Sequence, residues 1–158
     1  MSAHSLSQAK NYIVHTLRRA VDPDPSAKQI HALWEHFESR CAYCGCELHH
    51  DSRKAHRDHL DASGRNHISN RVLSCNICNG DDKREQNWER FLARRCGSDV
   101  EAHEARRQRI LDWQTACGNP PDIDAEVAAH VDRSIKACCC MLEDHYKRLQ
   151  LMSTSAAR

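Results

Sequence analysis

Four of the ten cysteines form two Cys-x-x-Cys pairs, Cys41/Cys44 and Cys75/Cys78. A spacer of two residues lets both sulfur atoms of a pair face one ion, and two such pairs can close a tetrahedral zinc site. A site of four thiolates has no open coordination position, so the sequence predicts a structural Zn²⁺ rather than a catalytic one. Cys46 is an alternative ligand, although its one-residue spacer from Cys44 makes a poorer chelate.

Three polar residues of a different kind accompany the cysteines: Asp58, His59 and Asn79. The carboxylate of Asp58 and the amide oxygen of Asn79 are ligands suited to a hard cation such as Mg²⁺. A histidine with an ordinary pKa of about 6.5 can accept a proton from water near neutral pH, which makes His59 a candidate general base. Neighbours on a strand point to opposite faces, so a site shared by Asp58 and His59 requires a bulge or a bend.

Basic residues surround this group, and the candidates for phosphate contact are Lys83, Arg84, Arg57 and His67. Such contacts supply affinity for a nucleic-acid backbone without choosing a sequence. His56 is a further candidate, because it shares a strand face with Asp58 if the strand is regular. The whole chain carries a net charge of only +1, so any nucleic-acid site must be a local patch.

Apolar residues spaced three and four apart predict helices over residues 5–20, 26–40, 99–116 and 122–152. Ser26 and Gln29 form the pattern of a capping box, and Asp122 or Asp124 is expected to cap the last helix. In the helix over 99–116 the side chains expected to face inward include Val100, Leu111 and Trp113. The final residues, STSAAR, are expected to be frayed.

The central stretch is predicted to hold two short strands, over 53–60 and 71–74, joined by the loop SGRNHIS. A helix is expected to start between Cys75 and Asn79, to continue to about Arg95 and to end at Cys96-Gly97. The predicted fold class is therefore α+β and mostly helical, with a small ββα core that is stapled by the zinc site. The predicted segments are N-terminal helices over 1–40, the core over 41–96 and a helical region over 97–158, packed as one compact domain.

Length and composition limit the classes of protein to which this chain can belong. A chain of 158 residues is about one domain. Ten cysteines would suggest a disulfide scaffold in a secreted chain, but the first twenty residues lack the apolar region of a secretion signal. No run of about 18 apolar residues occurs, so no membrane span is predicted. Reduced, metal-bound cysteines in the cytoplasm are the better expectation.

The segments CAYCG, RDHL, SNRVLSC and CNICNGDDK, taken in this order, resemble the zinc-knuckle branch of the HNH (ββα-metal) endonucleases. The resemblance implies that His59 activates water for attack on a phosphodiester and that Asp58 and Asn79 hold one divalent ion. It also implies that Asn70 pins the loop between the strands; Asn66 is the alternative for that task. Many members end the motif with histidine, and the amide of Asn79 instead favours Mg²⁺ or Mn²⁺.

The resemblance implies a metal-dependent endonuclease that nicks or cuts DNA and leaves 5′-phosphate and 3′-hydroxyl ends. The alternative is a zinc-stabilised nucleic-acid-binding module in which Asp58, His59 and Asn79 are not catalytic. Restriction or phage defence, with a protein partner, is one biological setting of such a centre. The last helix is long for a chain of this size, which suggests a homodimer through the C-terminal helix.

Overall fold

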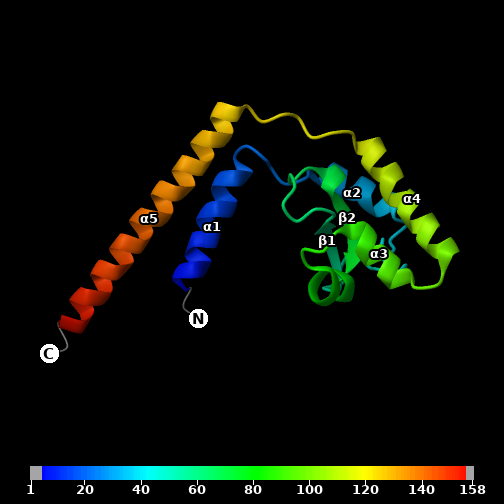
Figure 1. Cartoon of the computed structure of the whole chain (residues 1–158), viewed down its shortest axis with the longest axis horizontal. Helices are drawn as coiled ribbons and strands as arrows, with labels where there is room; N and C mark the ends of the chain where they lie inside the picture. Colours follow the sequence, from blue (N-terminus) through cyan, green and yellow to red (C-terminus); the bar gives the residue numbers. More distant parts are fainter. Residues whose placement is uncertain (1–4, 156–158) are drawn as a thin grey trace. The chain divides into compact units, whose positions relative to one another are not determined.

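The computed structural model describes residues 5–155, with the side chains of Asp81 and Ser155 left undescribed. It is mostly helical with one small antiparallel sheet, as predicted (Figure 1). In chain order the elements are α1 (Leu6–Arg19), α2 (Ala27–His36), β1 (Ala55–His59), η1 (Ile68–Asn70), β2 (Arg71–Cys75), η2 (Ile77–Lys83), α3 (Trp88–Cys96), α4 (Val100–Cys117) and α5 (Ala125–Ser155).

The chain divides into two compact units rather than the predicted single domain. One unit contains the described residues up to Pro23 together with those from Asp122 onward, and the other is Asp24–Pro121. The predicted boundaries at residues 40 and 96 differ from this division for a physical reason. The helix α2 belongs to the core through Leu33 and Trp34, whereas α1 packs against α5 from the other end of the sequence.

In the first unit, α1 and α5 lie side by side (Figure 1). Ser5 caps α1 in a capping box with Gln8, and Lys10 of α1 forms an ion pair with Glu143 of α5. Asp124, one of the two predicted caps, accepts hydrogen bonds from the first backbone N–H groups of α5. The helix α5 continues to Ser155, so residues 153–155 of the segment predicted to fray are helical, and 156–158 lie outside the described residues.

The second unit holds the buried core. The capping box of Ser26 and Gln29 is confirmed at the start of α2. The helix ends at His36, short of the predicted Arg40, because Glu38 and Ser39 adopt positive φ angles of 50° and 54°. Buried apolar side chains from α2, the strands, α3 and α4 then form one cluster, which includes Leu33, Phe37, Tyr43, Val72, Leu73, Phe91, Leu92, Ile110 and Trp113.

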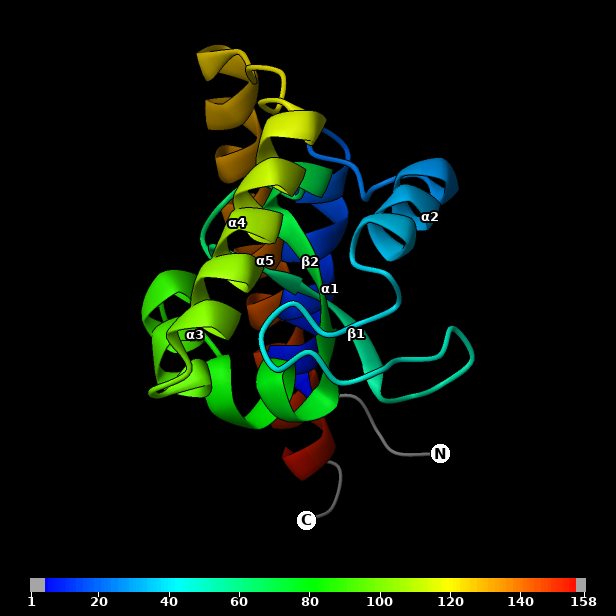
Figure 2. The same ribbon diagram turned by 90° about the vertical axis from the view of Figure 1, so that its right-hand side faces the viewer.

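The two strands pair in a regular antiparallel register that runs from Ala55 opposite Cys75 to His59 opposite Arg71. They lie within one residue or two of the predicted positions. The helix α4 crosses in front of β2 in Figure 2. The two are in contact, since Nε1 of Trp113 on α4 donates a hydrogen bond of 2.9 Å to the carbonyl of Arg71. Val100, predicted to face inward, is 75% exposed at the first turn of α4.

The prediction of one continuous helix from the second Cys-x-x-Cys pair to Arg95 is wrong. A π-helical segment, η2, follows β2 and ends at Lys83, because the next residue, Arg84, has a φ of 48° that cannot continue a helix. A new N-cap, Asn87, then starts α3 by accepting a hydrogen bond from the N–H of Arg90. Gly97 ends α3 with a φ of 60°, as its position predicted.

Candidate functional site

The cysteine sulfur atoms converge beside the hairpin. Those of Cys41, Cys44, Cys46 and Cys75 all lie within 4.8 Å of one another. The sulfur atoms of Cys44 and Cys75 are 3.8 Å apart, which matches the edge of about 3.8 Å in a tetrahedron of sulfurs each about 2.3 Å from zinc. The four cysteines could therefore hold a metal ion such as zinc.

Cys78, a member of the predicted ligand set, is not in this group of four, where Cys46 is found instead, but it lies beside the group. Its side chain is fully buried and forms hydrogen bonds with Cys41 and Cys44. Its backbone N–H points at the sulfur of Cys75, at 3.5 Å. The predicted ligand set contained Cys78 and ranked Cys46 as a poorer chelator, and the structure brings both thiols to the cluster. Five sulfur donors are thus available to an ion that takes four.

The pKa values of these neighbouring thiols are shifted in opposite directions, which a bound cation would change. Hydrogen bonds with Cys41 and then with Cys78 lower the pKa of Cys44, because they favour its thiolate. Hydrogen bonds with Cys41 and Cys44 raise the pKa of Cys78, so it keeps its proton beside the thiolate. A divalent ion removes this conflict, since it lets every ligating sulfur ionise at once. The donor set therefore suits a metal chemically as well as geometrically.

Asp58 is buried and already bound from two sides. Its Oδ2 accepts a hydrogen bond of 2.9 Å from the hydroxyl of Tyr43 and lies 3.0 Å from Nζ of Lys83. Burial, and then the charge of Asp58, raise the pKa of Tyr43, so the hydroxyl stays a donor. Lys83 has no exposed side-chain surface and also donates to the carbonyl of His59, at 2.6 Å. The lysine therefore ties η2 to the end of β1.

This arrangement differs from the predicted divalent-ion site. The regular pairing of β1 has no bulge, so Asp58 and His59 point to opposite faces of the strand. From η2 it is Lys83, rather than Asn79, that supplies a partner for Asp58. Asn79 is half-exposed. An ion at Asp58 would have to displace the Lys83 ammonium, so the residues as folded do not fit Mg²⁺ or Mn²⁺.

His59 lies half-buried at the last pair of the hairpin, opposite Arg71. Its ring forms a hydrogen bond with the side chain of Asn66, whose Oδ1 also accepts a hydrogen bond from Arg71. Burial lowers the pKa of His59 below its ordinary value, and the charge of Arg71 lowers it further. The imidazole is therefore neutral at pH 7 and able to accept a proton.

Asn70 fixes the loop that follows β1. Its Oδ1 accepts a hydrogen bond of 2.9 Å from the N–H of Asp61, and its Nδ2 donates to the carbonyls of Asp61 and Arg65 at 2.9 and 2.8 Å. Gly64 packs against the same amide. These contacts are of the kind that the resemblance implies for Asn70, whereas Asn66 contacts the histidine itself.

The four predicted phosphate contacts divide into two groups. Arg57 and Arg84 are exposed, and His67 is half-buried as the N-cap of η1. Lys83, in contrast, is buried in its ion pair and presents no surface to a phosphate. Arg84 also lines a polar surface cavity of about 430 Å³ together with two arginines of α3, Arg94 and Arg95.

Several contacts at the site were not predicted from the sequence. Tyr43 lies between the cysteines of the first pair, yet its hydroxyl is directed to Asp58. Arg95 of α3 forms a hydrogen bond with Cys44. The contact of Arg95 with Cys44 joins residues far apart in the sequence, so no local pattern predicts it.

No family model, no curated protein and no solved structure matches this chain. Among the described residues, no helix combines the length and the apolar character needed to cross a membrane.

Proposed function

We propose that this chain is an endonuclease of the HNH type that hydrolyses DNA phosphodiester bonds with His59 as the general base. One observation carries the proposal: His59 sits at the end of a hairpin next to a loop fixed by Asn70, and its ring is held by Asn66. Arg71 pairs with His59 at this end of the hairpin, and Arg57 lies two residues before His59, opposite Leu73. The motif order that resembles the HNH endonucleases supports this reading.

The chemistry of the step follows from the position of His59. The neutral imidazole takes a proton from water while the water oxygen forms its bond to phosphorus. The bond from phosphorus to the 3′ oxygen then breaks, and the departing oxygen takes a proton from solvent while the imidazolium of His59 releases its proton to solvent, which leaves 5′-phosphate and 3′-hydroxyl ends. Asn66 holds the ring in one orientation. Burial, and then the charge of Arg71, lower the pKa of His59, so the base is not already protonated.

The proposal includes one metal ion, and its role is structural. A structural Zn²⁺ at the cysteine cluster would join the segment before β1 to the end of β2, and ten free thiols suit the reducing cytoplasm. No divalent ion on Asp58 and Asn79 enters the reaction step, because the ammonium of Lys83 is paired with the carboxylate of Asp58.

A zinc-stabilised nucleic-acid-binding module without catalysis is the second candidate. The specific observation that favours it is the buried pair of Asp58 and Lys83, which commits the carboxylate to a structural role. The exposed Arg84 and the neighbouring Arg94 and Arg95 would then bind the phosphate backbone as in the first candidate.

Incubation of supercoiled plasmid with the purified protein separates the two candidates. The endonuclease predicts nicked or linear DNA, and parallel reactions with Mg²⁺, with Mn²⁺ and with EDTA establish whether a divalent ion is required. The binding module predicts a salt-sensitive mobility shift of intact DNA under all three conditions.

A further inference from the structure

The cysteine cluster contains thiols that solvent reaches and thiols that it does not reach. Cys41, Cys75 and Cys78 are buried, with exposed fractions of 2%, 5% and 0%, whereas Cys44 is half-buried and Cys46 is exposed. Buried structural thiols are inert, and oxidation selects the thiols that solvent can reach. An oxidant that arrives from solution therefore meets Cys44 and Cys46 first.

These two accessible thiols are neighbours in space as well as in sequence. Their sulfur atoms lie within 4.8 Å of each other, and the side chain of Cys46 forms a hydrogen bond with that of Cys44. The residue between them, Gly45, makes the turn with a φ of 74°, which residues with a side chain rarely adopt. The length of a disulfide bond is about 2.05 Å, so the two sulfur atoms need to approach by at most about 2.8 Å.

Guanidinium groups surround this turn. Arg95 forms a hydrogen bond with Cys44, and Nη1 of Arg40 donates to the carbonyl of Gly45 at 3.3 Å. Arg106 of α4 approaches the same glycine so closely that an added Cβ would lie 2.9 Å from its Nη2. Reactive cysteines occur in partly exposed, electropositive surroundings of this kind, because positive charge stabilises the thiolate that an oxidant attacks. The surroundings of Cys44 are thus those of a redox-active thiol.

We propose that Cys44 and Cys46 form a disulfide when a hydroperoxide reaches the cluster, and that this disulfide releases the structural Zn²⁺. The inference rests on the zinc site and not on the endonuclease activity. Cys46 is the thiol that the ion does not need, since five sulfur donors are available to an ion that takes four. Once Cys44 is oxidised, Cys41, Cys75 and Cys78 alone cannot complete a tetrahedral site.

The reaction balances with hydrogen peroxide as the oxidant. The thiolate of Cys44 attacks one peroxide oxygen, so an S–O bond forms and the O–O bond breaks, and the departing hydroxide takes a proton from solvent to become water. The thiol of Cys46 then gives its proton to solvent and attacks the sulfur of the sulfenic acid. The S–S bond forms, the S–O bond breaks, and the second hydroxide also becomes water. The two sulfur atoms lose two electrons together, and one peroxide becomes two molecules of water.

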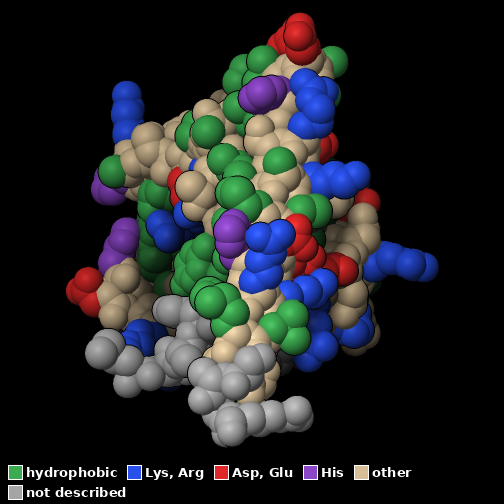
Figure 3. All heavy atoms as spheres, turned by 90° about the vertical axis from the view of Figure 1, so that its left-hand side faces the viewer, with side chains coloured by type: hydrophobic (Ala, Val, Ile, Leu, Met, Phe, Trp, Pro, Cys, Tyr) green, Lys and Arg blue, Asp and Glu red, His purple; other side chains and the backbone are tan. Residues whose placement is uncertain are grey.

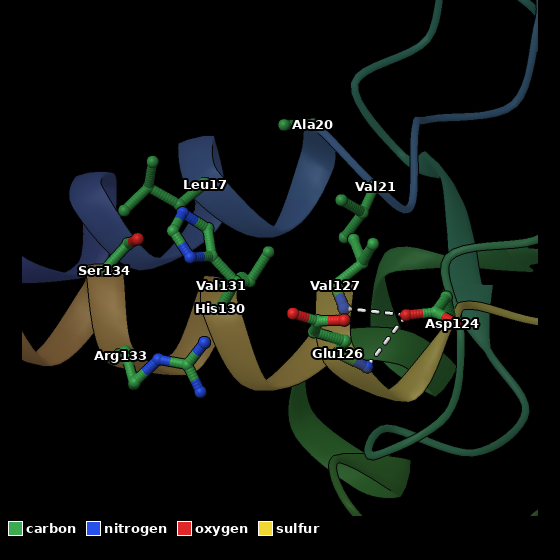
Figure 4. Close-up of a pocket in the computed structure, with 10 residues that line it drawn as sticks. All are labelled: Leu17, Ala20, Val21, Asp124, Glu126, Val127, His130, Val131, Arg133 and Ser134. Carbon is green, nitrogen blue, oxygen red and sulfur yellow. Dashed lines mark hydrogen bonds between the residues drawn. The ribbon is translucent and has the colours of Figure 1, made fainter.

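The cysteines of α5 lack these features. Cys138, Cys139 and Cys140 are consecutive in one helix, so their side chains point about 100° apart. Figure 3 shows hydrophobic side chains along the face that α5 presents, with Lys and Arg side chains at its border. The groove of about 510 Å³ between α1 and α5 has aliphatic walls that include Leu17 and Val127, and none of the residues that line it is a cysteine (Figure 4). Cys140 is exposed and therefore provides a matched control outside the cluster.

Zinc release and peptide mass test the proposal on the full chain, loaded with zinc and treated with excess hydrogen peroxide. A chromogenic zinc indicator is expected to report the loss of the bound Zn²⁺. The remaining thiols are then alkylated, and trypsin releases residues 41–53 as one peptide. This peptide is expected to carry alkyl at Cys41 and a disulfide between Cys44 and Cys46, which lowers its mass by about 2 Da, or two hydrogen atoms. A dithiol with added Zn²⁺ is expected to restore the site.

The variant Cys46→Ser removes the second accessible thiol. It is expected to bind zinc, and peroxide is expected to add oxygen atoms to Cys44, because no accessible neighbour ends the oxidation as a disulfide. A sulfinic acid does not return to the thiol with a dithiol, so the zinc site of this variant is expected to stay lost. Cys140→Ser is expected to release zinc and to recover it as the wild type does.

The proposal is overturned by a wild type that keeps its zinc under peroxide, or by a peptide over 41–53 whose disulfide includes Cys41. It is also overturned by a Cys46→Ser protein that fails to bind zinc, or that recovers zinc with the dithiol as fully as Cys140→Ser. Peptide mapping of the wild type uses no variant, so misfolding of a variant does not decide that result. None of these measurements involves DNA, so a protein without nuclease activity gives the same outcomes if the proposal is correct.

Discussion

The ammonium of Lys83 lies 3.0 Å from a carboxylate oxygen of Asp58, and the two side chains are 0% and 8% exposed. This ion pair connects the segment after the second cysteine pair to the strand that carries His59. It places a lysine where the resemblance to the HNH endonucleases implies a divalent ion. The ion pair therefore both stabilises the fold and occupies the position of the implied divalent ion.

Lys83→Met is expected to lower the free energy of unfolding by about 3–5 kcal/mol, because it leaves the buried charge of Asp58 without its cation. Arg84→Met, at the adjacent exposed position, is expected to change it by less than about 0.5 kcal/mol. Denaturant unfolding measures both. Adding Asp58→Asn to Lys83→Met should recover part of the loss, and a single variant as stable as the wild type would contradict the structural role of the pair.

Gly64→Ala is expected to destabilise the loop after β1. A Cβ at this position would lie 2.8 Å from Nδ2 of Asn70 and 3.3 Å from the carbonyl of Asp61. The amide cannot give way without losing the hydrogen bonds that fix the loop, so we expect a cost of about 1–3 kcal/mol. Gly80→Ala is the control, since nothing lies within 4 Å of its added carbon. Equal stability of the two variants would argue against a loop pinned by Asn70.

One zinc per chain is expected by elemental analysis, and its removal by a chelator should unfold the hairpin unit. Cys78→Ser is expected to lose the ion, because Cys78 is buried beside Cys41 and Cys44. Cys46→Ser is expected to keep it, because Cys46 is exposed and its spacer is poorer. Retention of zinc by Cys78→Ser together with loss by Cys46→Ser would assign the fourth ligand to Cys46.

The stability of the protein should depend on the protonation of His59. Its pKa in the folded chain lies below the unfolded value of about 6.5, so the unfolded chain binds the proton more readily. The free energy of unfolding should therefore rise with pH between the folded pKa and about 6.5, and fall as the solution is acidified through that window. His59→Gln should remove this component of the pH profile, whereas His49→Gln, at an exposed position, should keep it. Parallel profiles for the wild type and His59→Gln would contradict the lowered pKa.

Local signals account for the parts of the fold that the sequence predicted. The capping box at Ser26, the break at Gly97 and the period of the helices all depend on residues a few positions apart. The break at Arg84 could not be predicted from local residues, because arginine is not a residue type that favours a positive φ. Positions of strands and helices were therefore predicted well, and the interruption between η2 and α3 was not.

Long-range contacts account for what the sequence could not predict. The sequence predicts Lys83 to be a surface residue that contacts phosphate. Only the packing of η2 against β1 shows that it is buried beside Asp58. The choice between Asn66 and Asn70 likewise required the three-dimensional loop, which gives each asparagine a separate partner. The pairing of α1 with α5 joins the two ends of the chain, and no pattern within either helix specifies it.

The rate of plasmid cleavage by His59→Ala, relative to the wild type under single-turnover conditions, tests the central claim most directly. Removal of a general base is expected to slow cleavage by about 10²–10⁴-fold, while His49→Ala should cut at the wild-type rate. Circular dichroism and zinc content confirm that the variants are folded. Cleavage by His59→Ala as fast as by the wild type, or no cleavage by the wild type with any divalent ion, would contradict the assignment of His59 as the general base of an endonuclease.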